Sequence, residues 1–420
     1  MTHDTSSKGG GIYPRGFSLA TSWPWPLVKS ERLVSLHYGK ALRDGDRHSG
    51  SIPVYGTNGP CGLHDTPLVT GPGVILGRKG QGPLGVEWCD SDFWVIDTAY
   101  FAIPKTPELD LRYFYYVIKY IGLNHLKDGT SNPGLSRATF GDLLLPLPPL
   151  DTQRAICRFL HSLDQKVELN RRMNETLGTI ARTIFKSWFV DFNPVRENTT
   201  NFEQSALGKI PRGWRVAELG DIAEIIDCLH SKKPDRQQTG KPFLQLCNIK
   251  DDSLLDMTDT YFISEQDYER WISRMEAQEG DCVITNVGRV AAISQIPTGL
   301  RAALGRNMTG IRCRSKYPYP TILVQALTAD AMREEIALKV DSGTILDSLN
   351  VRSIPHLRLV LAPKEFLRKF ETACRPIRAR MELNLSQSHT LKSVRDMLVP
   401  KVMSGEIRLK DAEKIVETQA

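Results

Sequence analysis

The stretch that decides the fold is PLPPLDTQRAICRFLHSLDQKVELNRRMNETLGTIARTIFKSWFVDFNPV, which occupies residues 146–195. After its opening prolines it contains no further proline until Pro194, and its only glycine is Gly178. Its apolar residues recur mostly at spacings of three and four, which is typical of one face of an amphipathic helix. At 1.5 Å per residue such a helix is roughly 55 Å long, so the stretch predicts a spacer of coiled-coil type that needs a packing partner.

A partner for this helix is predicted within the same chain, because the sequence contains an internal repeat. A shift of 214 residues aligns Glu168 with Glu382 and Thr176 with Thr390, without any gap. The apolar stripe is repeated as well, which predicts a second long helix with a similar seam. The residues expected to pack along the two seams are Ile156, Leu160, Leu163, Val167, Leu177, Ile184, Phe370, Ile377, Met381, Leu391, Val394 and Leu398.

Two features of the repeat predict departures from a uniform seam. Ser162 aligns with Pro376, and proline lacks a backbone N–H and clashes with the preceding helical turn, so we expect the second helix to kink or restart there. Asn170 and Asn384 fall on or beside the apolar stripe. A buried asparagine can fix the register of a helix pair at some cost in stability.

The segments that precede the two helices also begin alike. A shift of 189 residues aligns Trp25 with Trp214 and Leu33 with Ile222, whereas the sequences that follow barely match. Both inserts contain short β-like runs separated by Gly, Pro, Asn and Asp, together with helical stretches. A repeated frame around unlike inserts predicts one scaffold that carries two different recognition units.

Composition narrows the class of protein. The 420 residues are 41% hydrophobic and 24% charged, without a long apolar run, which predicts a soluble chain of two or more domains with no membrane span. The first residues lack the apolar region of a signal peptide, so we expect a disordered leader and a cytoplasmic protein. The 8 cysteines form no C-x-x-C pair, which argues against a zinc ribbon and a disulfide framework. The net charge of +6 is compatible with a polyanionic ligand and equally with an ordinary surface.

No catalytic signature stands out in the sequence. Amino-methyltransferases need an Asn/Asp-Pro-Pro-aromatic loop, and Asn193-Pro194-Val195 lacks the second proline and the aromatic residue. The loop from Gly77 to Gly82 resembles a phosphate cradle, but no Gly-Lys-Ser/Thr follows. Because no His-x-x-x-His pair or Gly-x-Ser-x-Gly elbow occurs either, no catalytic residue and no metal ligand is assigned. A scattered set of carboxylates for a nuclease stays open as an alternative.

Three ordered blocks carry a family resemblance. These are LPPLDTQRAICRFLHSLDQKVELNRRMNETLGTIARTIFKSWFVDFNPV, the run SALGKIPRGWRVAELGDI at the start of the second half, and VRDMLVPKVMSGEI near the end of the chain. Over nearly its whole length the chain resembles the specificity subunit of type I restriction-modification systems.

The resemblance implies an α+β fold in which two mixed α/β target recognition domains are joined by two long antiparallel coiled-coil helices, with a pseudo-twofold internal repeat. Each domain would contact one half of a bipartite, asymmetric DNA sequence, and the helices would set the distance between the half-sites. The expected division is a disordered leader (1–19), the first recognition domain (20–145), the central spacer helix (146–190), a linker (191–213), the second recognition domain (214–362), the C-terminal spacer helix (363–410) and a tail (411–420).

The resemblance also implies partners that perform the chemistry. The chain would be a non-catalytic reader of double-stranded DNA that directs adenine methylation and restriction. Its partners would be two modification (methyltransferase) subunits and the restriction subunits, which are ATP-dependent endonucleases and translocases. No cofactor is expected in this chain, since S-adenosylmethionine, ATP and Mg²⁺ would bind to the partner subunits.

Candidate DNA contacts lie in loops rich in the residue types that bind phosphates and base edges. Asn and Gly in turns also serve positive φ angles, and an isolated Arg usually belongs to a solvated surface, so each residue alone is a weaker candidate than its loop. In the first insert the candidates are Tyr55, Thr57, Asn58, Arg78, Lys79, Gln81, Thr130, Ser131, Asn132, Ser136 and Arg137. In the second they are Gln245, Asn248, Lys250, Asn286, Arg289, Arg306, Asn307, Thr344 and Asn350.

Two other classes of function remain as alternatives. The first is a single-chain DNA methyltransferase or nuclease with its own recognition domains, which the missing methyltransferase loop disfavours. The second is a coiled-coil scaffold that does not read DNA, for which two unlike inserts would serve no purpose.

Overall fold

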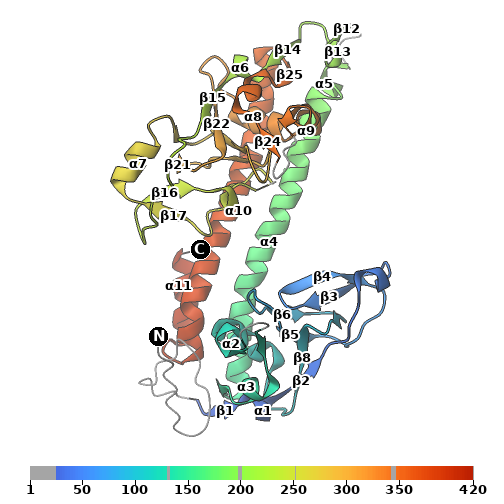
Figure 1. Cartoon of the computed structure of the whole chain (residues 1–420), viewed down its shortest axis with the longest axis vertical. Helices are drawn as coiled ribbons and strands as arrows, with labels where there is room; N and C mark the ends of the chain where they lie inside the picture. Colours follow the sequence, from blue (N-terminus) through green and yellow to red (C-terminus); the bar gives the residue numbers. More distant parts are fainter. Residues whose placement is uncertain (1–24, 130–132, 197–200, 251, 342–346, 420) are drawn as a thin grey trace. The chain divides into compact units, whose positions relative to one another are not determined.

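The computed structural model describes residues 25–129, 133–196, 201–250, 252–341 and 347–419. The leader predicted at residues 1–19 therefore lies outside the described residues. Contacts divide the chain into two units. Unit 1 comprises Met1–Val167 and Thr390–Ala420, and unit 2 comprises Glu168–His389. Two long helices, α4 (Leu150–Phe189) and α10 (Lys364–Met403), contribute residues to both units (Figure 1).

The β-rich part of unit 1, here called the first domain, runs from β1 to β11 and contains two main sheets. The larger sheet has the strand order β2-β8-β5-β6, and the smaller has the order β4-β3-β7 with a parallel β3–β7 pair. Two short pairs, β1–β11 and β9–β10, complete the set. The strands are β1 (Leu27–Lys29), β2 (Val34–Tyr38), β3 (Ile52–Gly56), β4 (Gly59–His64), β5 (Gly73–Gly77), β6 (Val86–Cys89), β7 (Trp94–Val95), β8 (Ala99–Pro104), β9 (Lys127–Asp128), β10 (Gly134–Leu135) and β11 (Leu144–Pro146).

Helices close the core of the first domain. The main one is α2 (Leu111–Ile121), which begins at Asp110, whose carboxylate accepts the N–H groups of Arg112 and Tyr113, and ends at Gly122 with φ of +68°. Both are standard helix boundaries, since Asp satisfies free N–H groups and Gly adopts positive φ without strain. The buried face of α2 packs into the same cluster as strands β2, β5, β6 and β8. The short helices are α1 (Ser30–Leu33), η1 (Asp44–Asp46), η2 (Asn124–Leu126) and α3 (Arg137–Gly141).

The β-rich part of unit 2, here called the second domain, runs from β14 to β25; it repeats the topology of the larger sheet and has one more strand in the smaller sheet. Its sheets have the orders β15-β22-β19-β20 and β17-β16-β21-β18, again with one parallel pair, β16–β21. The pairs β14–β25 and β23–β24 match β1–β11 and β9–β10. The strands are β14 (Arg215–Glu218), β15 (Ala223–Asp227), β16 (Lys241–Leu244), β17 (Tyr261–Ile263), β18 (Glu276–Ala277), β19 (Cys282–Thr285), β20 (Ile293–Gln295), β21 (Ala302–Leu304), β22 (Met308–Cys313), β23 (Val340–Asp341), β24 (Ser348–Leu349) and β25 (Arg358–Leu361).

The remaining elements of unit 2 surround these sheets. Within the described residues, α5 and the hairpin β12–β13 lie between α4 and the second domain in sequence. These elements are α5 (Asn193–Arg196), β12 (Phe202–Ser205), β13 (Gly208–Pro211), α6 (Leu219–Ile222), η3 (Leu246–Asn248), α7 (Glu265–Trp271), α8 (Pro320–Thr328), α9 (Asp330–Ala337) and η4 (Val351–His356). The α+β fold with two long helices and a repeated domain is confirmed.

The long helices are in contact along their apolar stripes. In unit 2, Phe189 of α4 packs on Phe366 and Phe370, whereas Asn174, four turns earlier in α4, donates a hydrogen bond to the carbonyl of Met381, later in α10. The helices are therefore antiparallel there. In unit 1 the last part of α10 shares a core with the first part of α4, and Arg395 pairs with Asp164 at 2.6 Å.

The residues predicted to pack along the seam are placed as follows. Ile156, Leu160, Leu163, Phe370, Met381, Leu391, Val394 and Leu398 are buried. Val167, Leu177, Ile184 and Ile377 are half-buried.

Asparagines lie between the two helices in unit 2. Asn170 and Asn384 are each only 1% exposed. The Asn384 amide donates to Asn174 at 2.9 Å, and the Asn170 amide donates to Gln387 at 3.1 Å and Ser388 at 3.3 Å. Each amide thus bonds across the helix pair, as a register-setting contact would.

The predicted restart of the second helix at Pro376 is wrong, since α10 neither ends nor restarts there, whereas the kink that was the other expectation stays a prediction. Pro376 is exposed, so the carbonyl that loses its N–H partner lies on the face of the helix where water can replace it. The buried neighbours Phe370, Cys374 and Met381 keep the opposite face against α4 and the core of unit 2.

A further helix, α11 (Leu409–Gln419), follows α10 in the segment treated above only as a tail. Ala412 is fully buried, and Ile415 and Val416 pack against the core of unit 1. Within the described residues, no helix combines the length and the apolar character that a lipid bilayer crossing requires.

Candidate nucleic-acid interface

Three loops of the first domain that were predicted from residue type lie against one another. The Thr57 hydroxyl donates to the carbonyl of Lys79 at 2.7 Å, and the Gly80 N–H donates to the carbonyl of Pro133 at 3.1 Å. Lys127 clamps the middle loop, because its ammonium donates to the carbonyls of Gly80 and Gly82 at 3.0 and 2.6 Å. The loops at 57–58, 78–82 and 133–137 therefore form one surface.

Two arginines on this surface converge on one aromatic ring. The Cζ atom of Arg78 lies 4.7 Å from the centroid of the Tyr38 ring, and that of Arg137 lies 4.6 Å from it. Tyr38 is 48% exposed at the end of β2 and stands 5.1 Å from Tyr100, centroid to centroid. We call Tyr38, Arg78 and Arg137 the arginine–tyrosine cluster. Cations are attracted to the negative face of an aromatic ring, which accounts for the convergence.

The remaining candidates of the first domain differ in accessibility. Asn58, Lys79 and Gln81 are exposed. Tyr55 is 7% exposed, and burial raises the pKa of its hydroxyl, so it belongs to the core. Ser136 caps α3 by accepting the N–H of Thr139 at 3.0 Å. Thr130, Ser131 and Asn132 lie outside the described residues.

In the second domain the candidates at residues 286, 307 and 350 also lie together. Asn286 donates its backbone N–H to the carbonyl of Asn307 at 2.8 Å and accepts the N–H of Leu349 at 2.8 Å. Its side chain is 5% exposed and is held by Thr309 and the carbonyl of Leu349. Asn350 is exposed but caps η4, and Thr344 lies outside the described residues.

Two arginines of the second domain are exposed near these strand ends. Arg306 lies in the turn between β21 and β22, beside Asn307, which has φ of +63°. Arg289 donates to the carbonyl of Ile249 at 3.1 Å and so joins its loop to the neighbouring segment at 245–250. These arginines are the accessible cations of this surface among the predicted residues.

The candidates at 245–250 are largely engaged within the second domain. Asn248 is 2% exposed; its side chain accepts the N–H of Gln245 at 2.8 Å and donates to the carbonyl of Asp256 at 2.7 Å. The Lys250 ammonium pairs with Asp256 at 3.2 Å, and Gln245 accepts from Lys233 at 2.5 Å. Asn248 therefore shapes its loop, and Gln245 and Lys250 are only half-buried.

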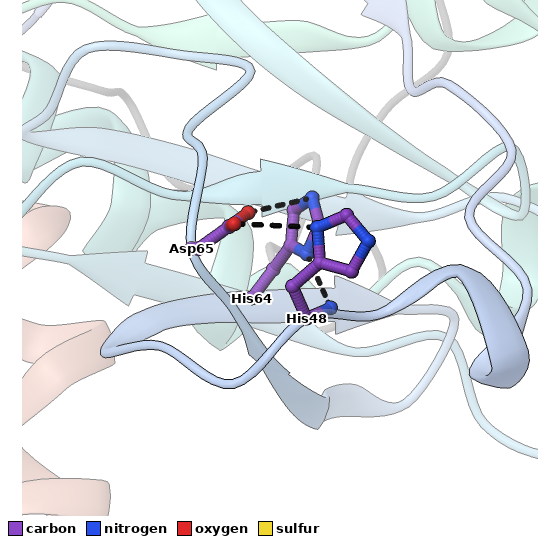
Figure 2. Close-up of side chains that lie close together, drawn as sticks. All are labelled: His48, His64 and Asp65. Carbon is purple, nitrogen blue, oxygen red and sulfur yellow. Dashed lines mark hydrogen bonds and ion pairs between the residues drawn. The ribbon is translucent and has the colours of Figure 1, made fainter.

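A cluster that sequence reasoning missed lies at the far end of β4, where His48, His64 and Asp65 face one another (Figure 2). Asp65 lies 3.3 Å from Nδ1 of His48 and 3.4 Å from Nε2 of His64. Nδ1 of His64 accepts the backbone N–H of His48 at 3.2 Å, which leaves the ring proton on Nε2. That nitrogen then has no lone pair for a metal, so the arrangement fits a hydrogen-bonded cluster.

The surroundings of the Asp65 carboxylate agree with a hydrogen-bonded cluster. A hydrogen bond from Thr66 and the two nearby imidazoles lower the pKa of its carboxyl group. The cluster joins the loop before β3 to the end of β4. Because residues 48 and 64 are far apart in the sequence and show no metal-ligand spacing, no pattern in the sequence indicated it.

Tyr38 is the second feature that sequence reasoning missed. It ends a strand, and nothing local distinguishes it from other exposed aromatic residues. Its meeting with Arg78 and Arg137 depends on the pairing of β2 with β8 and of β8 with β5.

Comparison with known proteins shows what the chain is similar to. Residues 35–178 match the family model of the type I restriction modification DNA specificity domain. The specificity subunit of the type I restriction enzyme MjaIX from Methanocaldococcus jannaschii is 27% identical over 323 residues, which cover 74% of this chain and 72% of that protein. The HindI specificity subunit from Haemophilus influenzae is 22% identical over 397 residues, covering 79% of this chain and 85% of that protein.

A solved structure shares the fold. The S subunit of a type I restriction-modification system from M. genitalium superposes with a TM-score of 0.60 at 16% sequence identity. The match covers 93% of this chain and 99% of that one.

Proposed function

We propose that the chain is a specificity subunit of a type I restriction-modification system and that it recognises a bipartite, asymmetric DNA target, one half with each domain. Its role as such a subunit is DNA target recognition, and the subunit itself is non-catalytic. Membership of a type I complex implies modification and restriction partners as well as DNA.

Those partners carry out the methylation and the cleavage of DNA. Two modification subunits bind S-adenosylmethionine and methylate adenine, and restriction subunits use ATP and Mg²⁺ to translocate and cut DNA. The complex works in the cytoplasm, where the chromosomal target lies. The chain itself contributes the choice of sequence.

The comparison of the two domains gives the main support for a bipartite target. The larger sheets of the two domains have the same strand order, and the N–H groups of Leu135 and Leu349 donate equivalent backbone hydrogen bonds at the strand ends, yet different side chains occupy equivalent places there. Two domains that recognise different DNA sequences can share one backbone scaffold but must carry different polar side chains, because base edges are distinguished by their pattern of donors and acceptors.

The proposed contacts are the candidate residues of the two loop surfaces that are not buried, and also the candidates that lie outside the described residues. In the first domain these are Thr57, Asn58, Arg78, Lys79, Gln81, Ser136 and Arg137, together with Thr130, Ser131 and Asn132. In the second they are Gln245, Lys250, Arg289, Arg306, Asn307, Thr344 and Asn350. The division of the chain into recognition domains 20–145 and 214–362, spacers 146–190 and 363–410, and the linker 191–213 is part of the same proposal.

Exchange of one domain tests the proposal. Residues 27–145 are replaced by the corresponding insert of another specificity subunit, the chain is expressed with its own modification subunits, and methylated adenines are mapped across the genome. We expect one half of the motif to change while the other half and the gap stay the same. A motif that changes in both halves, or that is unaltered, contradicts the proposal.

A second measurement separates this function from a single-chain methyltransferase. The purified chain is incubated with S-adenosylmethionine and target DNA, with and without the modification subunits. Methyl transfer is expected only with the subunits present. Methylation by the chain alone would favour the single-chain enzyme, and an absence of sequence-specific DNA binding in both mixtures would favour a scaffold.

A further inference from the structure

We propose that Arg137 reads a guanine in the half-site bound by the first domain, and that Tyr38 and Arg78 hold its guanidinium in place. The inference rests on the proposed function and adds a base and a residue to it. Both guanidinium carbons lie within 4.7 Å of the Tyr38 ring centroid, on a surface built by three loops.

The two arginines are held differently. Arg78 is half-buried, and its Nη1 donates to the carbonyl of Asp97 at 2.7 Å. Its backbone is fixed as well, since its N–H donates to Thr98 and its carbonyl accepts from Leu135. Arg78 is therefore a positioning residue. Arg137 is exposed at the first turn of α3, and Tyr38 is its contact among the described residues.

The two positive charges of the arginine–tyrosine cluster favour binding of a group with hydrogen-bond acceptors. Within the described part of the chain, neither guanidinium has a carboxylate within ion-pairing distance, so two like charges share one ring. The ring face reduces their repulsion only in part. A group rich in acceptors relieves it further, and guanine offers O6 and N7 at a spacing that the planar guanidinium fork matches.

The second domain shows that this cluster does not belong to the common frame. Backbone hydrogen bonds make Asn286 the equivalent of Arg78, because Leu349 donates to its carbonyl as Leu135 does to that of Arg78. By strand register Asp227 stands in the place of Tyr38, since each ends its strand opposite the equivalent residue of the neighbouring strand.

The position equivalent to Arg137 is also occupied by a different residue in the second domain. Ser136 and Asn350 cap equivalent turns, so Val351 follows where Arg137 does in the first domain. Every charged or aromatic member of the cluster is thus absent from the second domain. Phosphates must be held by both domains, whereas bases differ between half-sites. A cluster present in only one domain fits base reading better than phosphate binding.

The test uses the complex of this chain with its modification subunits and the target found by adenine mapping. Each guanine of the first half-site is replaced in turn by 7-deazaguanine, which lacks the N7 acceptor, and affinity is measured at fixed salt. We expect one position to weaken binding by about tenfold or more in the wild type. With Arg137→Ala, the natural target binds about tenfold or more weakly, and 7-deazaguanine at that position causes no further loss.

Arg137→Lys distinguishes a base contact from a phosphate contact. Lysine keeps the charge but not the fork, so we expect the variant to lose discrimination at that guanine while the slope of affinity against salt stays the same. Arg78→Lys and Tyr38→Leu are expected to reduce the same discrimination and to leave the other half-site unaffected. Arg43→Ala, which removes an exposed charge of the first domain outside the cluster, is the matched control.

Several outcomes overturn the inference. They are a first half-site without guanine, tolerance of 7-deazaguanine at every position, and an Arg137→Lys variant that binds and discriminates as the wild type does. An Arg137→Ala variant that weakens binding equally for all sequences identifies a phosphate contact instead. In each case sequence-specific binding by the wild-type complex leaves the proposed function standing, whereas its absence would refute that function.

Discussion

Glu335 of α9 shows how a single carboxylate joins elements of the second domain. Its side chain is 8% exposed and accepts two hydrogen bonds from Arg358 of β25, at 3.0 and 3.1 Å. The hydrogen bond from Arg358 is the main cause that lowers the pKa of this carboxyl group. A carboxylate held in this way stabilises the folded chain only while it is ionised.

The pH dependence of stability follows from the direction of this shift. The pKa in the folded state lies below the unfolded value of about 4.3, so the stabilisation is fully present above that value and is lost as pH falls through the folded pKa. We predict that Glu335→Gln lowers the urea midpoint at pH 7 and that the difference from wild type shrinks on acidification below about pH 4. Glu334→Gln, at the exposed neighbour, should show no such dependence.

At the scale of elements, α4 and α10 are helices of 40 residues each that correspond along their whole length, and a proline of α10 stands where α4 has a serine. Ser162 of α4 donates its hydroxyl to the carbonyl of Phe159, whereas Pro376 of α10 can make no bond through its nitrogen. The helix continues through Pro376 because its buried neighbours are anchored, so the proline lowers stability without ending the helix.

Substitution of Pro376 is expected to raise the free energy of unfolding. Pro376→Ala restores a backbone hydrogen bond and removes the clash with the preceding turn, so we expect the free energy of unfolding to rise by about 1–3 kcal/mol. Urea unfolding of the full chain, followed by circular dichroism, measures it. Ser162→Ala in α4 is the matched control, for which we expect a change within about 0.5 kcal/mol. A loss of stability in Pro376→Ala would show that α10 requires the proline.

At the scale of the whole molecule, the proposed spacer function makes the gap between half-sites a property of helix length. Insertion of seven residues into α4 and seven into α10, at facing positions of the antiparallel seam, keeps the apolar stripe in phase. Seven residues add about 10.5 Å, close to three base pairs. We predict that methylated adenines then report the same two half-sites with a gap longer by about three base pairs. An unchanged gap would contradict the spacer function.

Much of the architecture was predictable because its causes are local or repetitive. The spacing of apolar residues predicts helices wherever it persists, and α4 and α10 confirm it. The 214-residue repeat predicted a second long helix, and the shared topology of the two domains agrees with it. The restart predicted at Pro376 was wrong because helix propensity is a local quantity, whereas the packing that maintains α10 comes from the rest of unit 2.

The sequence alone therefore determined the two long helices, the repeated frame and the loops rich in DNA-binding residue types. Only the tertiary structure decided which residues of those loops are buried and which side chains contact one another. Asn248 and Asn286 are buried in hydrogen bonds, while Arg78 and Arg137 meet at Tyr38. Helical periodicity depends on residues that are close together in the sequence, so it can be recognised from the sequence alone. The strand order β2-β8-β5-β6, which brings these three side chains together, arises from pairings between distant segments.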